Sequence, residues 1–298
     1  AYEIGMDPLE FRRKNLIHGY YEDAYLKPIA ANTNGIFECL EKGAEYIHWD
    51  EKRKAYQNQT GDIRRGVGMA LFSYKTGVWP ISLEIAGARL SLNQDGSVQL
   101  QVGATEIGQG ADTVFSQMAA ETLHMDISRV HIVTQQDTDV TPFDTGAYAS
   151  RQSFVTGTAV KECAQQLKQK ILEYARTLVP GNVDRLELED GYILADGKPA
   201  ISLEDLAMES YYSLSNSSVL TAEVSRQVKK NTVASGCCFA EVEVDMKLGK
   251  IKVLDIVNVH DSGTLLNPQL AAMQVHGGMF MGIGYGVSEQ LLIDEKTG

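Results

Sequence analysis

Gln109 lies between two glycines, Gly108 and Gly110, at the point where an expected strand ends and a helix is expected to begin near Ala111. Glycine lets the backbone approach a bound group closely, and the first N–H groups of a helix have no partner within the helix. Such a turn can hold a phosphate or another anion, while the glutamine amide can donate and accept hydrogen bonds. A tight loop with a helix cap would use the same residues without any ligand.

A second candidate site lies at residues 143–153, where small residues alternate with Tyr148, Arg151 and Gln152. The small members of this run are Gly146, Ala147, Ala149 and Ser150. Such a stretch can lie flat against a planar ligand and donate several backbone hydrogen bonds. The aperiodic segment 135–153 favours a binding loop, because loops of this length are uncommon as connectors. A solvated surface loop is the alternative for the same residues.

A third candidate is the segment 258–286, in which a glycine-rich and mostly apolar run begins at Gln274. Each glycine inside a helix costs about 1 kcal/mol relative to alanine, so this composition predicts a buried helix under a site. The glycines do not directly follow a strand, as the dinucleotide-binding fingerprint would require. His260 and His276 lack a third ligand at metal-binding spacing, so we expect them to be core or supporting residues.

Two copies of one local plan are expected to position these segments. Alternating apolar residues predict a hairpin over 88–102, and a helix follows near Ala111. The same order recurs over 240–253, with a helix near Pro268. This internal repeat of hairpin, polar loop and helix places two helix N-termini beside two corresponding loops.

Other helices are predicted by capping residues and by apolar periodicity. Asp7 and Pro8 indicate the start of one helix, and another is expected over 35–55 with Ile36, Leu40 and Tyr46 on one face. A third, over 156–178, has one apolar face formed by Val160, Cys163, Ala164, Leu167, Ile171, Ala175 and Leu178.

The composition is that of a globular protein. The 298 residues carry a formal net charge of −12 and are 44% hydrophobic. Without a basic face the chain is not expected to bind nucleic acid, and no apolar stretch is long enough for a membrane helix. The four cysteines have neither zinc-finger nor disulfide-framework spacing. With no signal peptide evident, we expect a cytoplasmic protein.

These patterns predict an α+β fold of two lobes, each built from antiparallel β-hairpins packed with helices. We expect a helical lead-in over 1–60, a first lobe over 61–215 and a second lobe over 216–298. The Ser/Asn-rich loop at 213–218 is the expected boundary between the lobes.

The three candidate stretches, in this order and at these separations, resemble the molybdenum-binding subunit of the xanthine dehydrogenase family of molybdenum hydroxylases. The resemblance extends from the opening Gly5-Met6-Asp7-Pro8-Leu9 to the last residue. Segments 85–90, 104–114 and 136–144 are similar to the bacterial xanthine dehydrogenase branch. The resemblance implies that both lobes bind a molybdenum cofactor with molybdopterin and that the second lobe is incomplete at its C-terminus. Whether the cofactor has the cytosine dinucleotide form stays open.

The resemblance also implies roles for individual residues. Gln109, in its turn with Gly108 and Gly110, would contact the pterin, and Ala147 would pack close to the metal through its backbone. The pterin and its pendant phosphate or nucleotide would be held by Gly146, Ala149, Ser150, Arg151 and Gln152, and from the second repeat by Gln274. Val78 and Trp79 would face the substrate, where an aromatic ring suits stacking on a flat heterocycle. No side chain is expected to ligate the metal.

The implied function is hydroxylation of a purine such as hypoxanthine or xanthine, with electrons passing to 2Fe–2S and FAD-binding subunits or domains. The family's catalytic glutamate lies in a Gly-Glu-x-x motif without a counterpart here, so no catalytic residue is assigned. The isolated chain, a fragment or a split subunit, is therefore expected to be inactive without the remainder of the molybdenum subunit. A related enzyme acting on aldehydes, nicotinate or carbon monoxide, or a non-catalytic structural half-subunit, are the alternatives.

Overall fold

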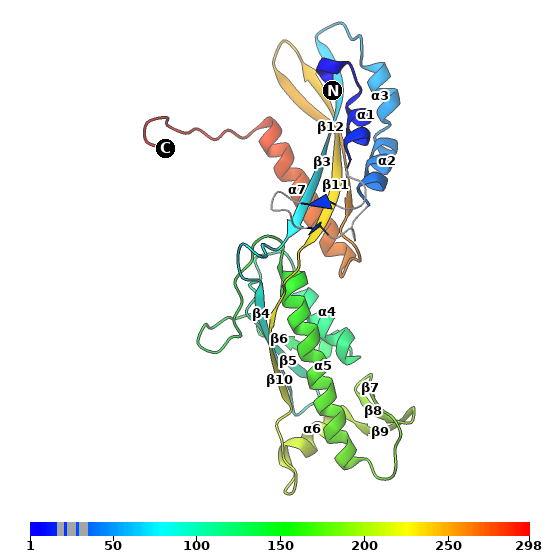
Figure 1. Cartoon of the computed structure of the whole chain (residues 1–298), viewed down its shortest axis with the longest axis vertical. Helices are drawn as coiled ribbons and strands as arrows, with labels where there is room; N and C mark the ends of the chain where they lie inside the picture. The colour runs from blue at the N-terminus through cyan, green and yellow to red at the C-terminus, as the bar shows by residue number, and fades with distance from the viewer. Residues whose placement is uncertain (17–20, 23–27, 30–34) are drawn as a thin grey trace. The chain divides into compact units, whose positions relative to one another are not determined.

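The chain forms two compact units, each of which combines antiparallel strands with helices (Figure 1). The computed structural model describes residues 1–16, 21–22, 28–29 and 35–298. Unit 1 comprises Ala1–Lys75 and Thr232–Gly298, and unit 2 comprises Thr76–Asn231. The predicted α+β class is confirmed. No helix in the described ranges is both long and apolar enough to cross a membrane.

The two units divide the chain differently from the predicted lobes 61–215 and 216–298. Strand β3 (Ile63–Thr76) shares a sheet with β11 (Thr232–Asp245) and β12 (Lys250–Asp261), in the order β12-β11-β3. The expected lead-in and the second hairpin therefore belong to one unit, although residues 17–20, 23–27 and 30–34 of that lead-in lie outside the described residues. The loop at 213–218 lies inside unit 2, because pairing between distant strands overrides a local loop signal.

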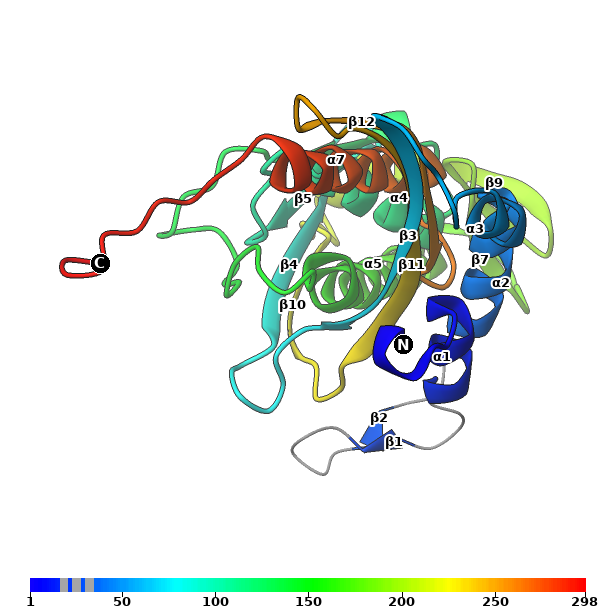
Figure 2. The same cartoon turned by 90° about the horizontal axis from the view of Figure 1, so that it is seen from above.

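Unit 1 places helices on both faces of its sheet. Its remaining elements are η1 (Tyr2–Ile4), α1 (Pro8–Asn15), β1 (Tyr21–Glu22), β2 (Pro28–Ile29), α2 (Ile36–Tyr46), α3 (Trp49–Ala55) and α7 (Pro268–Val287). Side chains alternate along β11, so Cys237 and Phe239 are buried in the core with α2, whereas Cys238 faces α7. Figure 2 shows α2 and α7 on opposite sides of the sheet.

The N-terminal helices confirm one prediction and correct another. Helix α1 begins at Pro8 with Asp7 as its cap, and Asp7 Oδ1 accepts hydrogen bonds from Leu9 N at 2.8 Å and Trp49 Nε1 at 3.1 Å. The single helix expected over 35–55 is instead two, because His48 adopts a left-handed φ of 57° between α2 and α3. Leu40 is buried whereas Tyr46 is 69% exposed, so the two side chains do not share a face as predicted.

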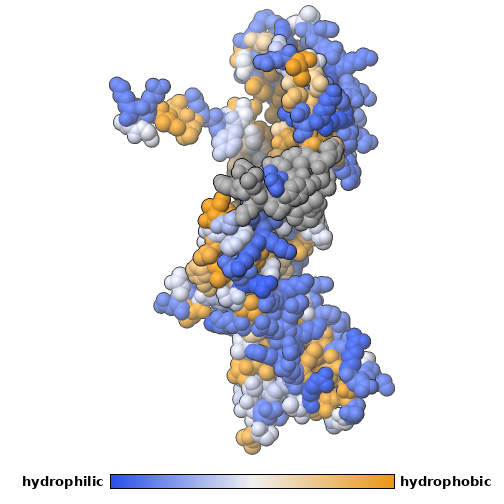
Figure 3. Space-filling model, in the orientation of Figure 1, coloured by the Kyte–Doolittle hydropathy of each residue, from blue (hydrophilic) through white to orange (hydrophobic). Residues whose placement is uncertain are grey.

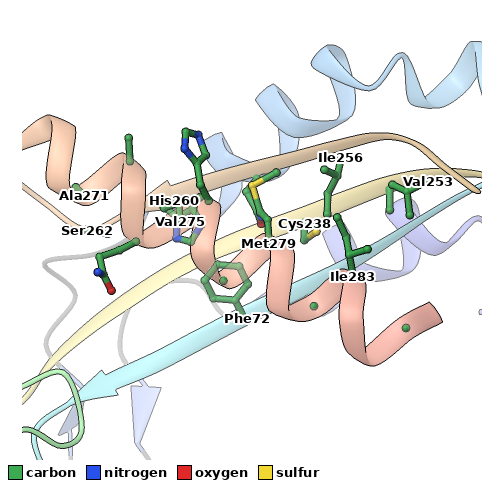
Figure 4. Close-up of a pocket in the computed structure, with 18 of the residues that line it drawn as sticks. Phe72, Cys238, Val253, Ile256, His260, Ser262, Ala271, Val275, Met279 and Ile283 are labelled. Carbon is green, nitrogen blue, oxygen red and sulfur yellow. The ribbon is translucent and has the colours of Figure 1, made fainter. Parts of the chain in front are cut away.

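The second repeat confirms its hairpin and its helix start but not the burial of that helix. The stripe Val275, Met279 and Ile283 of α7 faces β11 and β12 across a cavity of about 1150 Å³ (Figure 4). No residue of α7 is buried, and Phe280 and Tyr285 are 77% and 70% exposed. The predicted buried helix is therefore wrong for this chain, because unit 1 covers only one side of α7. Apolar side chains are also exposed on the segment after α7 (Figure 3).

Unit 2 carries the first repeat on a four-stranded sheet of order β10-β4-β5-β6. These strands are β4 (Ile85–Leu92), β5 (Val98–Val102), β6 (Val130–Ile132) and β10 (Thr221–Gln227). The other elements are α4 (Ala111–Leu123), η2 (Ile127–Arg129), α5 (Gln152–Leu178), α6 (Leu203–Tyr212), and a small sheet of β7 (Leu186–Glu189), β8 (Tyr192–Ala195) and β9 (Lys198–Ser202). Helix α5 starts four residues before the predicted 156, and its apolar face packs against β4 and β10.

Candidate cofactor-binding site

The Gly108-Gln109-Gly110 turn lies between β5 and α4, as the sequence predicted. Gly108 and Gly110 have φ values of 97° and 87°, a left-handed conformation in which glycine is favoured. A Cβ built at Gly108 would meet no atom within 4 Å, so open space lies beside this backbone. The turn therefore leaves room for a ligand to approach its main chain.

The N-terminus of α4 is capped from within the chain, as in the alternative of a tight loop with a helix cap. The Glu106 carboxylate accepts hydrogen bonds from Gly108 N at 2.7 Å, Gly110 N at 3.0 Å and Asp112 N at 3.1 Å. An acidic side chain at this position satisfies the unpaired N–H groups and the positive end of the helix dipole. The chain thus supplies its own anion, and Glu106 fixes the shape of the glycine turn.

Glu106 makes the stability of this turn depend on pH. Burial raises the pKa of Glu106, but the N–H groups of Gly110, Asp112 and Gly108 outweigh it and lower the pKa overall. A carboxyl group with a lowered pKa stabilises the fold above its unfolded value of about 4.3, and this contribution is lost as pH falls through the lowered folded pKa. We expect Glu106→Gln to reduce the free energy of unfolding by about 1 kcal/mol at pH 7, as for other lost helix caps.

The measurement is urea denaturation at a series of pH values between roughly 7 and 3, where carboxyl groups titrate. Wild type should lose its advantage over Glu106→Gln as pH falls through this range. Glu121→Gln, at an exposed position on the same helix, is the matched control. A constant difference between wild type and Glu106→Gln at every pH would contradict the assignment.

Gln109 joins the glycine turn to the start of α5. Its Nε2 donates to Gln152 Oε1 at 2.5 Å and to Thr105 O at 3.0 Å, and its Oε1 accepts from Ile107 N at 2.7 Å. Gln152 Nε2 also donates to Thr105 O, at 3.1 Å. Two predicted site residues from separate stretches of the chain are therefore in direct contact.

Arg151 is turned toward carboxylates of its own unit rather than outward to a ligand. Its side chain is fully buried, with Nε 2.6 Å from Glu84 Oε2 and Nη1 2.5 Å from Asp144 Oδ1. Nη1 and Nη2 also donate to Gly146 O and Ile85 O. Burial lowers the pKa of Arg151, but Glu84 and Asp144 outweigh it and raise the pKa overall. The guanidinium of Arg151 is thus fully occupied by partners within unit 2, and the predicted part of Arg151 in holding the cofactor stays a prediction.

The backbone of residues 147–150 offers the donors that Arg151 does not. Ala149 and Ser150 have φ values of 48° and 52°, which is uncommon for residues with a side chain and recurs at functional sites. Among the bonds formed within the described ranges, none is donated by the N–H groups of Ala147, Ala149 or Ser150. Unpaired backbone N–H groups near left-handed residues can form a concave anion-binding site, so this segment could accept an anionic group.

Val78 and Trp79 lie beside the same loop. Val78 N donates to Glu84 Oε1 at 2.6 Å, and Gly77 N donates to Ala149 O at 2.9 Å. The Asn231 amide makes two hydrogen bonds to the Trp79 backbone. Its Oδ1 accepts from Trp79 N at 3.2 Å, and its Nδ2 donates to Trp79 O at 2.5 Å. Val78 and Trp79, predicted to face the substrate, form the substrate wall, and residues 143–153 form the predicted cofactor loop. The wall and the loop are joined by the hydrogen bond from Gly77 N to Ala149 O.

Unit 2 therefore brings together all the predicted site residues that it contains. Gln274 belongs to unit 1, where it lines the cavity beneath α7 and is exposed. Its part in the site stays a prediction. The described residues include no group of three or more His, Cys, Asp or Glu side chains that could hold a metal ion.

Sequence reasoning missed four residues that shape the site: Glu84, Glu106, Asp144 and Asn231. Glu84 interrupts an apolar strand pattern just before Ile85, and such an acid would be costly to bury without a partner. Asp144 precedes Gly146 in the candidate loop, a common arrangement for an Asx turn. Those signals were present, but nothing local showed that both acids share Arg151.

The cysteines do not contribute a reactive group to the site. All four are free thiols. Burial raises the pKa of Cys163 to about 11 and that of Cys237 to about 12. Thiolates are the reactive form, so these two side chains stay protonated and inert at neutral pH.

Comparison with known families identifies the class of protein to which this arrangement corresponds. Residues 42–298 match the model of the molybdopterin cofactor-binding domain, and the chain belongs to this family. It is homologous to part of the molybdenum-binding subunit of xanthine dehydrogenase. The resemblance inferred from the sequence is confirmed.

Individual relatives agree with this membership. The chain is 46% identical over its full length to the xanthine dehydrogenase molybdenum-binding subunit of Escherichia coli O157:H7, of which it spans 40%. It is similar in fold to quinoline 2-oxidoreductase from Pseudomonas putida 86, with a TM-score of 0.82 at 22% identity over 99% of this chain and 39% of that one. A CO dehydrogenase from Oligotropha carboxidovorans gives a TM-score of 0.81 at 22% identity over 98% of this chain and 39% of that one.

Proposed function

We propose that this chain holds molybdopterin within a molybdenum hydroxylase subunit, and that the complete enzyme hydroxylates purines such as hypoxanthine and xanthine. The observation that carries the proposal is that the 143–153 loop is hydrogen-bonded both to Gln109 of the glycine turn and to Gly77, next to Val78 and Trp79, in a member of the molybdopterin-binding family. The 46% identity to a xanthine dehydrogenase subunit favours a purine over the aldehyde, nicotinate and carbon monoxide alternatives.

The residues of this chain bind and orient the cofactor. Gln109 and the open backbone at Gly108 would contact the pterin, while the N–H groups of residues 147–150 would hold its phosphate or nucleotide. Gln274 would contribute from the second repeat. The bound molybdenum cofactor supplies oxygen insertion into a carbon–hydrogen bond with removal of two electrons. The role of this chain is to fix the cofactor's position and its electrostatic surroundings.

Trp79 and Val78 would form one wall of the substrate pocket. The Trp79 ring has Lys229 Nζ at 6.0 Å from its centroid, a cation–π distance that favours one ring orientation. A flat aromatic wall suits a flat heterocycle, because offset stacking buries apolar area on both partners. The two hydrogen bonds between Asn231 and the Trp79 backbone would hold this wall in place.

The remainder of the molybdenum subunit completes the site in this proposal. It would supply the catalytic glutamate and cover the exposed face of α7, where the side chains of Met273, Phe280 and Tyr285 are 57%, 77% and 70% exposed. Electrons would pass to 2Fe–2S and FAD partners. The four free cysteines fit a reducing compartment, the cytoplasm.

The test is made on the complete complex that contains this chain. Elemental analysis for molybdenum, together with pterin fluorescence after oxidation, should show both components in stoichiometric amounts. Steady-state assays should then show turnover with hypoxanthine or xanthine and weaker turnover with aldehydes. Absence of molybdenum and pterin would favour a structural half-subunit, and preference for an aldehyde would overturn the assignment of purine as the substrate.

A further inference from the structure

A buried cluster of three charged side chains lies between the substrate wall and the cofactor loop. Glu84, Asp144 and Arg151 are all fully buried at the side chain. The guanidinium makes four hydrogen bonds, to the two carboxylates and to the carbonyls of Gly146 and Ile85. Buried ion pairs add little net stability, because desolvation offsets their attraction. Their constraint on geometry is therefore the property to examine.

The Glu84 side of the cluster holds the substrate wall. Glu84 Oε1 accepts the Val78 N–H at 2.6 Å, while Oε2 accepts Arg151 Nε at 2.6 Å. One carboxylate therefore bonds the 77–79 turn and the guanidinium at the same time. The Glu84 backbone is itself fixed, because its carbonyl accepts from Val228 N at 2.8 Å.

The Asp144 side of the cluster holds the cofactor loop. Asp144 Oδ1 accepts from Gly146 N at 2.9 Å as well as from Arg151, and Oδ2 accepts from Thr156 Oγ1 at 2.7 Å. These bonds tie the loop start to the first turns of α5. Apart from the Glu84 link, Arg151 still has Asp144, Gly146 O and Ile85 O as partners.

We propose that Glu84, Arg151 and Asp144 form a positioning triad in which Glu84 sets the Val78–Trp79 wall, Asp144 sets the cofactor loop, and Arg151 couples the two. The assignment of wall and loop rests on the proposed function. Loss of Glu84 frees the wall while the loop keeps its other bonds, so substrate binding weakens and cofactor retention does not. Loss of Asp144 frees the loop instead, so cofactor retention weakens and substrate binding does not.

The first test is hydrogen exchange of the full chain, which needs neither cofactor nor activity. In Glu84→Gln a single acceptor oxygen remains for two donors, Val78 N and Arg151 Nε. Hydrogen exchange in the 77–82 segment should therefore accelerate about tenfold through local opening. Exchange in the 145–151 segment should stay within about twofold of wild type. Asp144→Asn should accelerate the 145–151 segment instead, and Arg151→Met should accelerate both. Glu223→Gln, which removes a carboxylate from an exposed pair with Arg89, is the control and should change neither.

The second test uses the complete complex. Glu84→Gln should raise KM for the purine about tenfold, more than it lowers kcat per molybdenum, and keep molybdenum content within about twofold of wild type. Asp144→Asn should lower molybdenum content instead. Should Glu84→Gln fail to fold, Glu84→Asp keeps the charge but shortens the reach, and the same split is expected.

Two results would overturn the triad: unchanged exchange at 77–82 in the Glu84 variant, or equal acceleration of both segments by the Glu84 and Asp144 variants. The second of these would mark the cluster as general structural support. A wild-type complex without molybdenum or purine turnover would contradict the proposed function instead. The exchange pattern would then still decide whether the triad couples the two segments.

Discussion

Replacing Arg151 with methionine is expected to lower the free energy of unfolding of unit 2 by about 3–5 kcal/mol, because it leaves buried carboxylates without their counter-charge. Glu84 and Asp144 both have fully buried side chains, so water cannot take the place of the guanidinium. Methionine keeps much of the side-chain volume, which separates the loss of charge from the creation of a cavity.

The change is measured by urea denaturation, followed by the fluorescence of Trp79 in a Trp49→Phe background, since each unit contains one of the two tryptophans. Arg89→Met is the matched control. Arg89 pairs with Glu223 at 2.8 Å but is 34% exposed, and such pairs contribute about 0–1 kcal/mol. Equal losses of unfolding free energy in the two methionine variants would show that the buried cluster stabilises unit 2 no more than an exposed ion pair does.

Replacing Gln109 with alanine is expected to lower the molybdenum content of the complete complex about tenfold, an effect of about 1.4 kcal/mol on cofactor binding. The alanine removes the amide that bonds Gln152, Thr105 and Ile107 and that would contact the pterin. Gln109 is only half-buried, so the free energy of unfolding should change by no more than about 1 kcal/mol.

Molybdenum analysis and thermal unfolding of the same preparations separate the two effects. Gln99→Ala, at an exposed position on β5, is the control and should keep the cofactor. A Gln109→Ala complex with normal molybdenum content would count against the glycine turn as a cofactor contact. Loss of cofactor together with a large loss of stability would show instead that Gln109 acts on folding.

The structure changes which groups of the candidate site are available to bind an anion. From the sequence, the N-terminus of α4 and the Arg151 side chain were candidates for anion binding, with a helix cap and a solvated loop as the alternatives. Both are already satisfied, by Glu106 and by the pair Glu84 and Asp144. The free donors are backbone N–H groups at residues 147–150, so the predicted loop keeps its proposed role through other atoms.

Local patterns in the sequence determined much of the fold. Alternation of apolar residues and turn chemistry located both hairpins, and the cap at Asp7 and the helix expected near Pro268 stand at observed helix starts. Glycine content and the aperiodic stretch 135–153 indicated the candidate binding loops. Each of these signals depends on neighbours a few residues apart, so the chain expresses them before any tertiary contact forms.

Only the tertiary structure decided which residues meet. Glu84 and Arg151 are 67 positions apart, and β3 joins β11 across the whole of unit 2 in sequence. No periodicity carries that information, because ion pairs and strand pairing between distant segments depend on how the chain folds back. The burial of α7 depends in the same way on what covers its second face, so a glycine-rich apolar helix can be recognised from its sequence while its exposure cannot.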